Sequence, residues 1–298
     1  LLYGSILCLI IKKEDKNMIY LIVATVCRCG MGVMIRYAEH NCENMKAVTV
    51  FNYLICVIMS FSFMPNKEVF FSASGAKFAL YLGLLNGLLY FGNLLLYQLN
   101  IRKNGTPITV SFSHLGVLLP TVLSLVLFKE RPSSFQWIGI GLAVIAIVVI
   151  NYEPKSKLTS NLTFKMGLIL LFFVGGLTDM MSKVYENYGN HQLGSTFLLF
   201  TFMVALGASF VWFMLTNRKV GLKEIIFGVG MGLFNYLSTF FLLQSLIKLP
   251  AFLVYPVYSV GVIIVINFIN YFLMKEPISK KQYVGMIIIA IALACLNS

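Results

Sequence analysis

The stretch LFKERPSSFQWIGIGLAVIAIVVIN, residues 127–151, organises the chain because it occurs twice. It returns as LMKEPISKKQYVGMIIIAIALACLN at residues 273–297, so each position matches one 146 residues later, with no gap. The shared motif residues and their counterparts are Lys129-Glu130 and Lys275-Glu276, Ser133 and Ser279, Gln136 and Gln282, and Gly139 and Gly285. An internal repeat of about half the chain is the first feature that the fold has to accommodate.

The repeat extends backwards from this stretch through both halves. At the same offset, the matches are Gln98 and Gln244, Arg102 and Lys248, and Ser113 and Ser259. With one more residue of offset, Arg36 and Glu39 match Lys183 and Glu186.

The composition is that of a membrane protein. Of 298 residues, 59% are hydrophobic and only 11% are charged, with a mean hydropathy of +0.85. Soluble domains carry about 25% charged residues. The net charge of +12 is spread over short loops. This favours contact with lipid headgroups over nucleic-acid binding, which needs a basic face on a folded domain.

Ten apolar runs of helical length predict ten membrane spans. A bilayer admits only helices or closed barrels, so we expect an all-α bundle. We assign residues 18–152 to a first five-helix repeat, 153–164 to a connecting loop and 165–298 to a second repeat. Residues 1–17 stay outside the repeats, and the natural start could be Met18. The predicted spans are 18–38, 46–64, 76–98, 107–128, 134–151, 165–186, 194–216, 222–247, 251–273 and 279–297.

Five spans per half predict that the second half is inverted relative to the first, with a two-fold axis in the membrane plane. Charge bias between the two sides should then be weak. The loop lysines and arginines mildly favour an N-terminus on the outside.

The repeated Lys-Glu, Ser/Gln and Gly pattern resembles the EamA type of the drug/metabolite transporter superfamily, over residues 18–298. The resemblance implies two five-helix repeats and a central cavity lined by the third, fourth, eighth and ninth helices. It also implies cytoplasmic termini, against the charge count, and we follow the resemblance. A multi-pass protein of the bacterial plasma membrane is expected. These motifs are specific for the fold and carry no information on the substrate.

Two charged residues inside predicted spans form the sharpest site hypothesis. Arg28 lies near the middle of the first span, and Asp179 lies inside the sixth, which is its repeat-mate. Intramembrane charges are costly and face the bundle interior or water. Arg28 could anchor an anionic group or pair with Asp179, and substrate or a proton could compete for either partner. A purely structural ion pair is the alternative.

Other candidates are polar side chains in the helices that the resemblance assigns to the cavity. His114 could relay protons, although a packed, hydrogen-bonded histidine is the commoner role. Interhelical hydrogen bonding is the alternative for the others. They are Asn86, Tyr90, Asn235, Tyr236, Tyr255 and Ser259.

The chain contains no nucleotide-binding loop, paired catalytic carboxylates or metal-ligand spacing, and Cys27-x-Cys29 is interpreted as packing. We therefore expect no enzyme, cofactor or metal. The prediction is a secondary transporter for a small organic metabolite, driven by protons or by exchange. A lipid-flipping or scaffold subunit and a cationic drug exporter remain alternatives. The expected partners are a small solute and the lipid bilayer, for a monomer or homodimer without nucleic acid.

Overall fold

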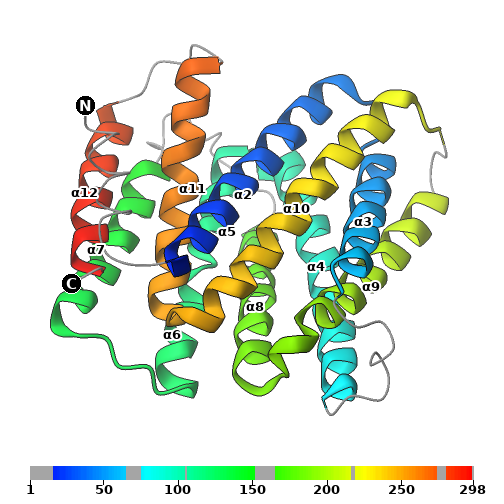
Figure 1. The fold of residues 1–298 in the computed structure, drawn as a ribbon. Coiled ribbons are helices and arrows are strands. Elements are labelled where there is room, and N and C mark those ends of the chain that lie inside the picture. The colour runs from blue at the N-terminus through cyan, green and yellow to red at the C-terminus, as the bar shows by residue number, and fades with distance from the viewer. Residues whose placement is uncertain are drawn as a thin grey trace. The chain divides into compact units, whose positions relative to one another are not determined.

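The chain is represented by a computed structural model that describes residues 16–64, 75–104, 106–151, 165–215, 219–273 and 280–296. All regular secondary structure in these ranges is helical (Figure 1). The helices are α2 (Lys16–Asn41), α3 (Met45–Ser62), α4 (Ala76–Asn104), α5 (Thr106–Leu115), α6 (Leu118–Leu127), α7 (Ser134–Asn151), α8 (Lys165–Tyr188), η2 (His191–Leu193), α9 (Gly194–Met214), α10 (Leu222–Lys248), α11 (Ala251–Leu273) and α12 (Lys280–Leu296).

These helices match the predicted spans and confirm an all-α, multi-pass membrane protein. Within the described ranges, six helices are long and apolar enough to cross a bilayer. Four shorter apolar stretches, 112–127, 134–149, 251–266 and 283–296, account for the remaining spans. The assignment of residues 18–152 and 165–298 to repeats of opposite orientation stays a prediction.

The fourth span is broken into two helices, α5 and α6. Proline has no N–H, so Pro120 cannot bond to the carbonyl of Gly116 four residues earlier. Leu119 N–H donates to that carbonyl instead, at 3.1 Å, and the chain passes through Gly116 and Val117 before α6 begins. Pro256, by contrast, lies inside α11 without ending it.

The residues of the repeated motif at 127–151 make contacts at helix ends. Ser133 and Gln136 form a capping box at the start of α7: the Ser133 Oγ accepts from the Gln136 N–H at 3.2 Å. The Ser133 N–H donates to Gln136 Oε1 at 2.9 Å. Each side chain thus accepts a hydrogen bond from the backbone N–H of the other residue. Without these bonds, the two N–H groups at this helix end would have no acceptor.

Glu130 performs a similar role for a helix of the other half. Its carboxylate accepts from the backbone N–H groups of Ala251 and Phe252, at 3.0 and 3.1 Å, at the start of α11. Lys129 just before it has a φ of 54°, the left-handed turn that ends α6. The counterpart motif residues Glu276 and Ser279 lie outside the described residues.

The described residues group into two compact units that do not coincide with the sequence halves. Unit 1 combines parts of Leu1–Ile22, Asn93–Met180 and Lys248–Ser298. Unit 2 combines Val23–Gly92 and Met181–Ile247. Three helices, α2, α4 and α8, continue from one unit into the other.

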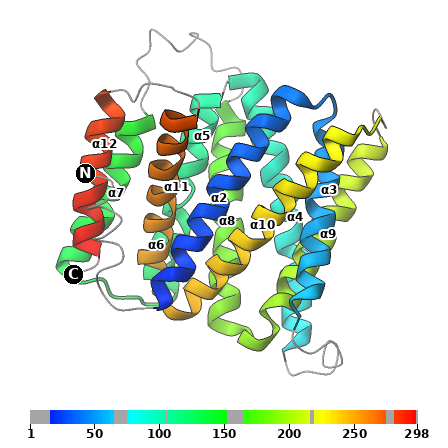
Figure 2. The ribbon, with the colours of Figure 1, turned by 45° about the horizontal axis from the view of Figure 1, so that its top comes forward.

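Inside each unit, helices pack against their counterparts from the other half of the sequence. In unit 1, α7 packs against α12 and α6 against α11. In unit 2, α3 packs against α9, and the two run side by side in both views (Figures 1 and 2). Gly139 permits the α7–α12 contact, because a Cβ there would lie 2.8 Å from Leu296 Cγ.

Two glycine pairs in unit 2 make matching contacts. In α4, a Cβ on Gly83 or Gly87 would lie 2.9 Å or less from a backbone carbonyl of α9, at Phe197 or Thr201. In α10, Gly228 and Gly232 stand in the same relation to the carbonyls of Val48 and Asn52 in α3. Small residues allow this close helix approach in membranes.

Candidate functional site

A buried polar cluster in unit 2 joins helices α3, α4 and α10. Asn235 Nδ2 donates to Asn52 Oδ1 at 3.1 Å. One turn further along α10, the Thr239 hydroxyl lies 3.1 Å from the Tyr90 hydroxyl of α4 and 2.9 Å from the Asn235 carbonyl. Both asparagines are almost completely buried. The cluster therefore holds amides and hydroxyls inside a membrane-spanning bundle.

Aromatic rings surround this cluster. Phe202 of α9 is central: its ring centroid lies 5.6 Å from that of Tyr90 and 6.4 Å from those of Tyr53 and Tyr236. Phe202 and Tyr236 are both fully buried. The sequence predicted Tyr90, Asn235 and Tyr236 as candidates, and the structure brings them into one region.

Asn86 stands out on α4. Its side chain is fully buried, yet neither atom of its amide has a hydrogen-bond partner among the described residues. Asn93, seven residues later and therefore on the same face of α4, also has a buried side-chain oxygen without such a partner. Native proteins leave few buried polar groups unsatisfied, so each one calls for an explanation.

Arg28 of unit 2 lies in the middle of α2 and is exposed. One of its guanidinium nitrogens is 3.5 Å from the sulfur of Met31. On the same helix, the Ala24 carbonyl accepts a hydrogen bond from Ser238 of α10, at 3.0 Å. An exposed guanidinium at this depth is expected to face water rather than lipid chains.

Unit 1 brings four other candidates into two pairs. The Ser259 hydroxyl of α11 lies 3.3 Å from His114 Nδ1, near the end of α5. One turn earlier in α11, the Tyr255 hydroxyl donates to the backbone carbonyl of Asp179, at 2.6 Å. The histidine is thus next to the interruption between α5 and α6, where broken helices often line transport sites.

Arg28 and Asp179 belong to different units, so their pairing stays a prediction. Lys183, which follows Asp179 on α8, pairs with Glu186 at 2.6 Å, as expected for a structural ion pair. Sequence reasoning missed Asn52 and Phe202. Asn52 could have been noticed as an amide in the middle of an apolar span, whereas nothing in the sequence distinguishes Phe202 from the other phenylalanines.

Comparison with known proteins now adds the family. A model of the EamA-like transporter family matches residues 15–152. The chain belongs to the EamA-like transporter family. This agrees with the resemblance carried by the repeated Lys-Glu, Ser/Gln and Gly motif. Membership of a transporter family implies a small-molecule substrate and a location in a membrane.

Two relatives and one solved structure are similar to this EamA-like transporter. An uncharacterised protein of Haemophilus influenzae is 25% identical over 289 residues, covering 93% of this chain and 96% of its own length. The quaternary ammonium compound-resistance protein QacG of Staphylococcus sp. is 34% identical over 75 residues, 24% of this chain and 69% of QacG. A crystal structure with 13% identity superposes with a TM-score of 0.72, covering 94% of this chain and 98% of that one, which supports the fold.

The residues described in this EamA-like transporter can bind but offer no evident catalytic set. Among them, no group of three or more His, Cys, Asp or Glu side chains could hold a metal ion. What they provide is an exposed guanidinium, buried amides and hydroxyls, aromatic rings and a histidine paired with a serine. These groups can hold a solute by hydrogen bonds, ring contacts and charge.

Proposed function

We propose that this EamA-like protein is a secondary transporter that moves a small organic solute by alternating access. The observation that carries the proposal is the buried amide of Asn86, which has no partner among the described residues. We assign this amide to the solute path, together with Tyr90, Asn235 and Tyr236. The membrane expected for such a protein is the bacterial plasma membrane.

The free-energy cost of burying an unpaired amide favours a role for Asn86 in binding a ligand. An unsatisfied buried polar group costs about 1–3 kcal/mol, and an apolar residue of similar size would remove that cost. A polar solute that passes Asn86 can donate to its oxygen and accept from its nitrogen. The neighbouring rings of Tyr90, Tyr236 and Phe202 suit a solute with an apolar or aromatic body.

Coupling to protons or to a counter-solute is assigned to three groups. His114 carries an imidazole that can pass a proton from one ring nitrogen to the other, and it is hydrogen-bonded to Ser259. Asp179 is an acid inside α8, and its backbone carbonyl is held by Tyr255 of α11. Arg28 supplies a fixed positive charge in α2 for an anionic group of the solute or for Asp179.

The test is counterflow in proteoliposomes with the variant Asn86→Leu. Vesicles loaded with pools of amino acids, amines, nucleosides or sugars are diluted into traces of the same labelled compounds. The wild type should accumulate label from one pool. Asn86→Leu should lose this accumulation by about tenfold or more, as expected when about 1–3 kcal/mol of solute contact disappears, while its melting temperature stays equal or rises.

Asn100→Leu is the matched control on the same helix. Asn100 is equally buried, but its amide donates to the Leu96 carbonyl and accepts from Asn104. This variant should lower the melting temperature. Full counterflow by Asn86→Leu, in a sample where wild type transports, would remove Asn86 from the solute path.

A cationic drug exporter is the second candidate, because a quarter of the chain is similar to QacG. The aromatic rings near Tyr90 could stack on a quaternary ammonium group. Pools of quaternary ammonium compounds in the same assay separate the two candidates. A lipid-flipping or scaffold subunit would instead move none of these solutes.

A further inference from the structure

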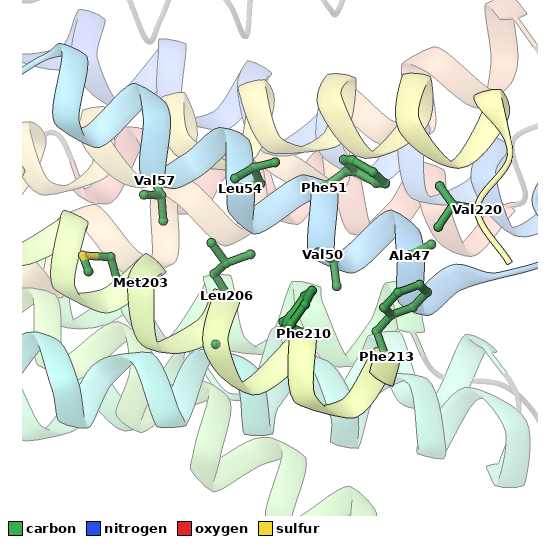
Figure 3. A pocket seen from close by; sticks show the side chains of 11 residues that line it. Ala47, Val50, Phe51, Leu54, Val57, Met203, Leu206, Phe210, Phe213 and Val220 are labelled. Atoms are coloured by element: carbon green, nitrogen blue, oxygen red, sulfur yellow. The ribbon is translucent and has the colours of Figure 1, made fainter. Parts of the chain in front are cut away.

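Unit 2 carries an apolar groove away from the polar cluster, between α3 and α9. Side chains from Ala47 to Val57 of α3 form one wall, and side chains from Met203 to Phe213 of α9 form the other (Figure 3). Val220, from the loop before α10, closes one end. The groove has a volume of about 600 Å³. Gly207 lies on its wall, and a Cβ there would meet no atom within 4 Å.

The dimensions fit a single acyl chain. The ten residue steps from Ala47 to Val57 span about 15 Å along the helix, half of the hydrocarbon thickness of about 30 Å and therefore one leaflet. A volume of about 600 Å³ over that length gives a cross-section of about 40 Å².

The two ends of the groove differ in charge. Near Val57 and Met203 the walls are apolar (Figure 3). At the other end, Lys46 precedes Ala47, and its ammonium lies 4.7 Å from the centre of the Trp212 ring, beside Phe213. Lys219 and Lys223 flank Val220 and are exposed. Aromatic and basic residues together are typical of the headgroup level of a membrane.

The basic end is held in place by a buried carboxylate. Glu224 accepts from the backbone N–H groups of Glu43, Asn44 and Gly221, at 3.0, 3.4 and 3.0 Å. Asn44 Nδ2 also donates to the Lys219 carbonyl at 2.9 Å. The loop before α3 and the loop before α10 are therefore tied together, and Glu224 is engaged by three donors. Glu43 is the other acid here and is exposed.

We propose that the α3–α9 groove binds one anionic phospholipid, with an acyl chain along the groove and the phosphate at Lys46, Lys219 and Lys223. The apolar walls suit the acyl chain of the lipid. The lysines, together with Trp212, suit a negatively charged headgroup. This binding site is independent of the solute path.

Fluorescence of Trp212 tests the proposal on the full chain. The chain has two tryptophans, so Trp137→Phe on α7 leaves Trp212 as the reporter. Phosphatidylglycerol with brominated acyl chains should quench Trp212 at a mole fraction at least about fivefold lower than brominated phosphatidylcholine, because each lysine near the headgroup contributes about 1 kcal/mol. Lys46→Gln should bring the two curves about fivefold closer together, because Lys219 and Lys223 remain. Equal quenching by both lipids in the unaltered groove would overturn the proposal.

Filling the groove provides a second, independent test. Gly207→Leu occupies open space in the groove, whereas Gly141→Leu occupies open space on α7 and is the matched control. Gly207→Leu should weaken quenching by both lipids, because its side chain occupies the space of the acyl chain, and Gly141→Leu should behave as the parent. Unchanged quenching in Gly207→Leu, or a change in oligomeric state without a change in quenching, would assign the groove to other contacts and refute lipid binding.

Discussion

The repeated motif owes its form to contacts of single residues at helix ends. Glu130 caps α11, Ser133 and Gln136 cap α7, and Gly139 lets α7 approach α12. None of these contacts involves a residue proposed for the solute path. This explains in physical terms why the motif indicates the fold and carries no information on the substrate.

Removal of the Glu130 carboxylate should destabilise the protein. Glu130→Ala deprives two N–H groups of their acceptor, for an expected loss of about 2 kcal/mol in the free energy of unfolding. Glu130→Gln keeps one carbonyl oxygen and should lose about half as much. Thermal unfolding in detergent measures both. Glu43→Ala, at an exposed carboxylate, is the control, and equal melting temperatures for Glu130→Ala and Glu43→Ala would refute the capping role.

The sequence predicted several candidate site residues as polar groups in the helices that the family resemblance assigns to the cavity. Asn86, Asn235, His114 and Ser259 are among these candidates, and the structure places Asn235 in the buried cluster of unit 2 and His114 beside Ser259. The partners across helices could not be predicted. Asn52 and Phe202 matter only through neighbours on other helices, and a single sequence does not reveal these contacts.

At the scale of elements, helix positions followed from hydrophobic length, with ends within three residues of the prediction except for α4, which ends six residues later at Asn104. The interruption between α5 and α6 could be anticipated from Pro120, but Pro256 leaves α11 continuous. Proline removes one hydrogen bond in either case, and packing around the helix decides whether it continues. The neighbours of each helix did not follow from the sequence, because most of the surface of these helices is apolar and does not specify a particular partner.

The glycine contacts give the prediction at this scale. Gly87→Ala and Gly232→Ala each place a methyl group 2.5 Å from a backbone carbonyl of the facing helix, which cannot move as a side chain can. Each should therefore lose about 1–3 kcal/mol of stability. Gly207→Ala and Gly141→Ala meet no atom within 4 Å and should change little. Thermal unfolding of all four variants measures these differences in stability. Equal stability of the four variants would contradict the close α4–α9 and α10–α3 contacts.

At the scale of the whole molecule, the sequence repeat and the compact units divide the chain differently. Each unit takes helices from both halves, and counterpart helices such as α7 and α12 pack together. The repeat itself was readable from the 146-residue offset, but its assembly into two mixed units depends on long-range packing.

The most direct test of the account is charge movement by purified protein in proteoliposomes on an electrical sensor. Pools of small organic solutes are applied with and without a pH gradient, to wild type and to Asp179→Asn. We predict a current from one pool in the wild type that is lost in Asp179→Asn. A well-folded wild type that gives neither current nor counterflow with any pool would contradict the proposal that this EamA-like protein is a secondary transporter.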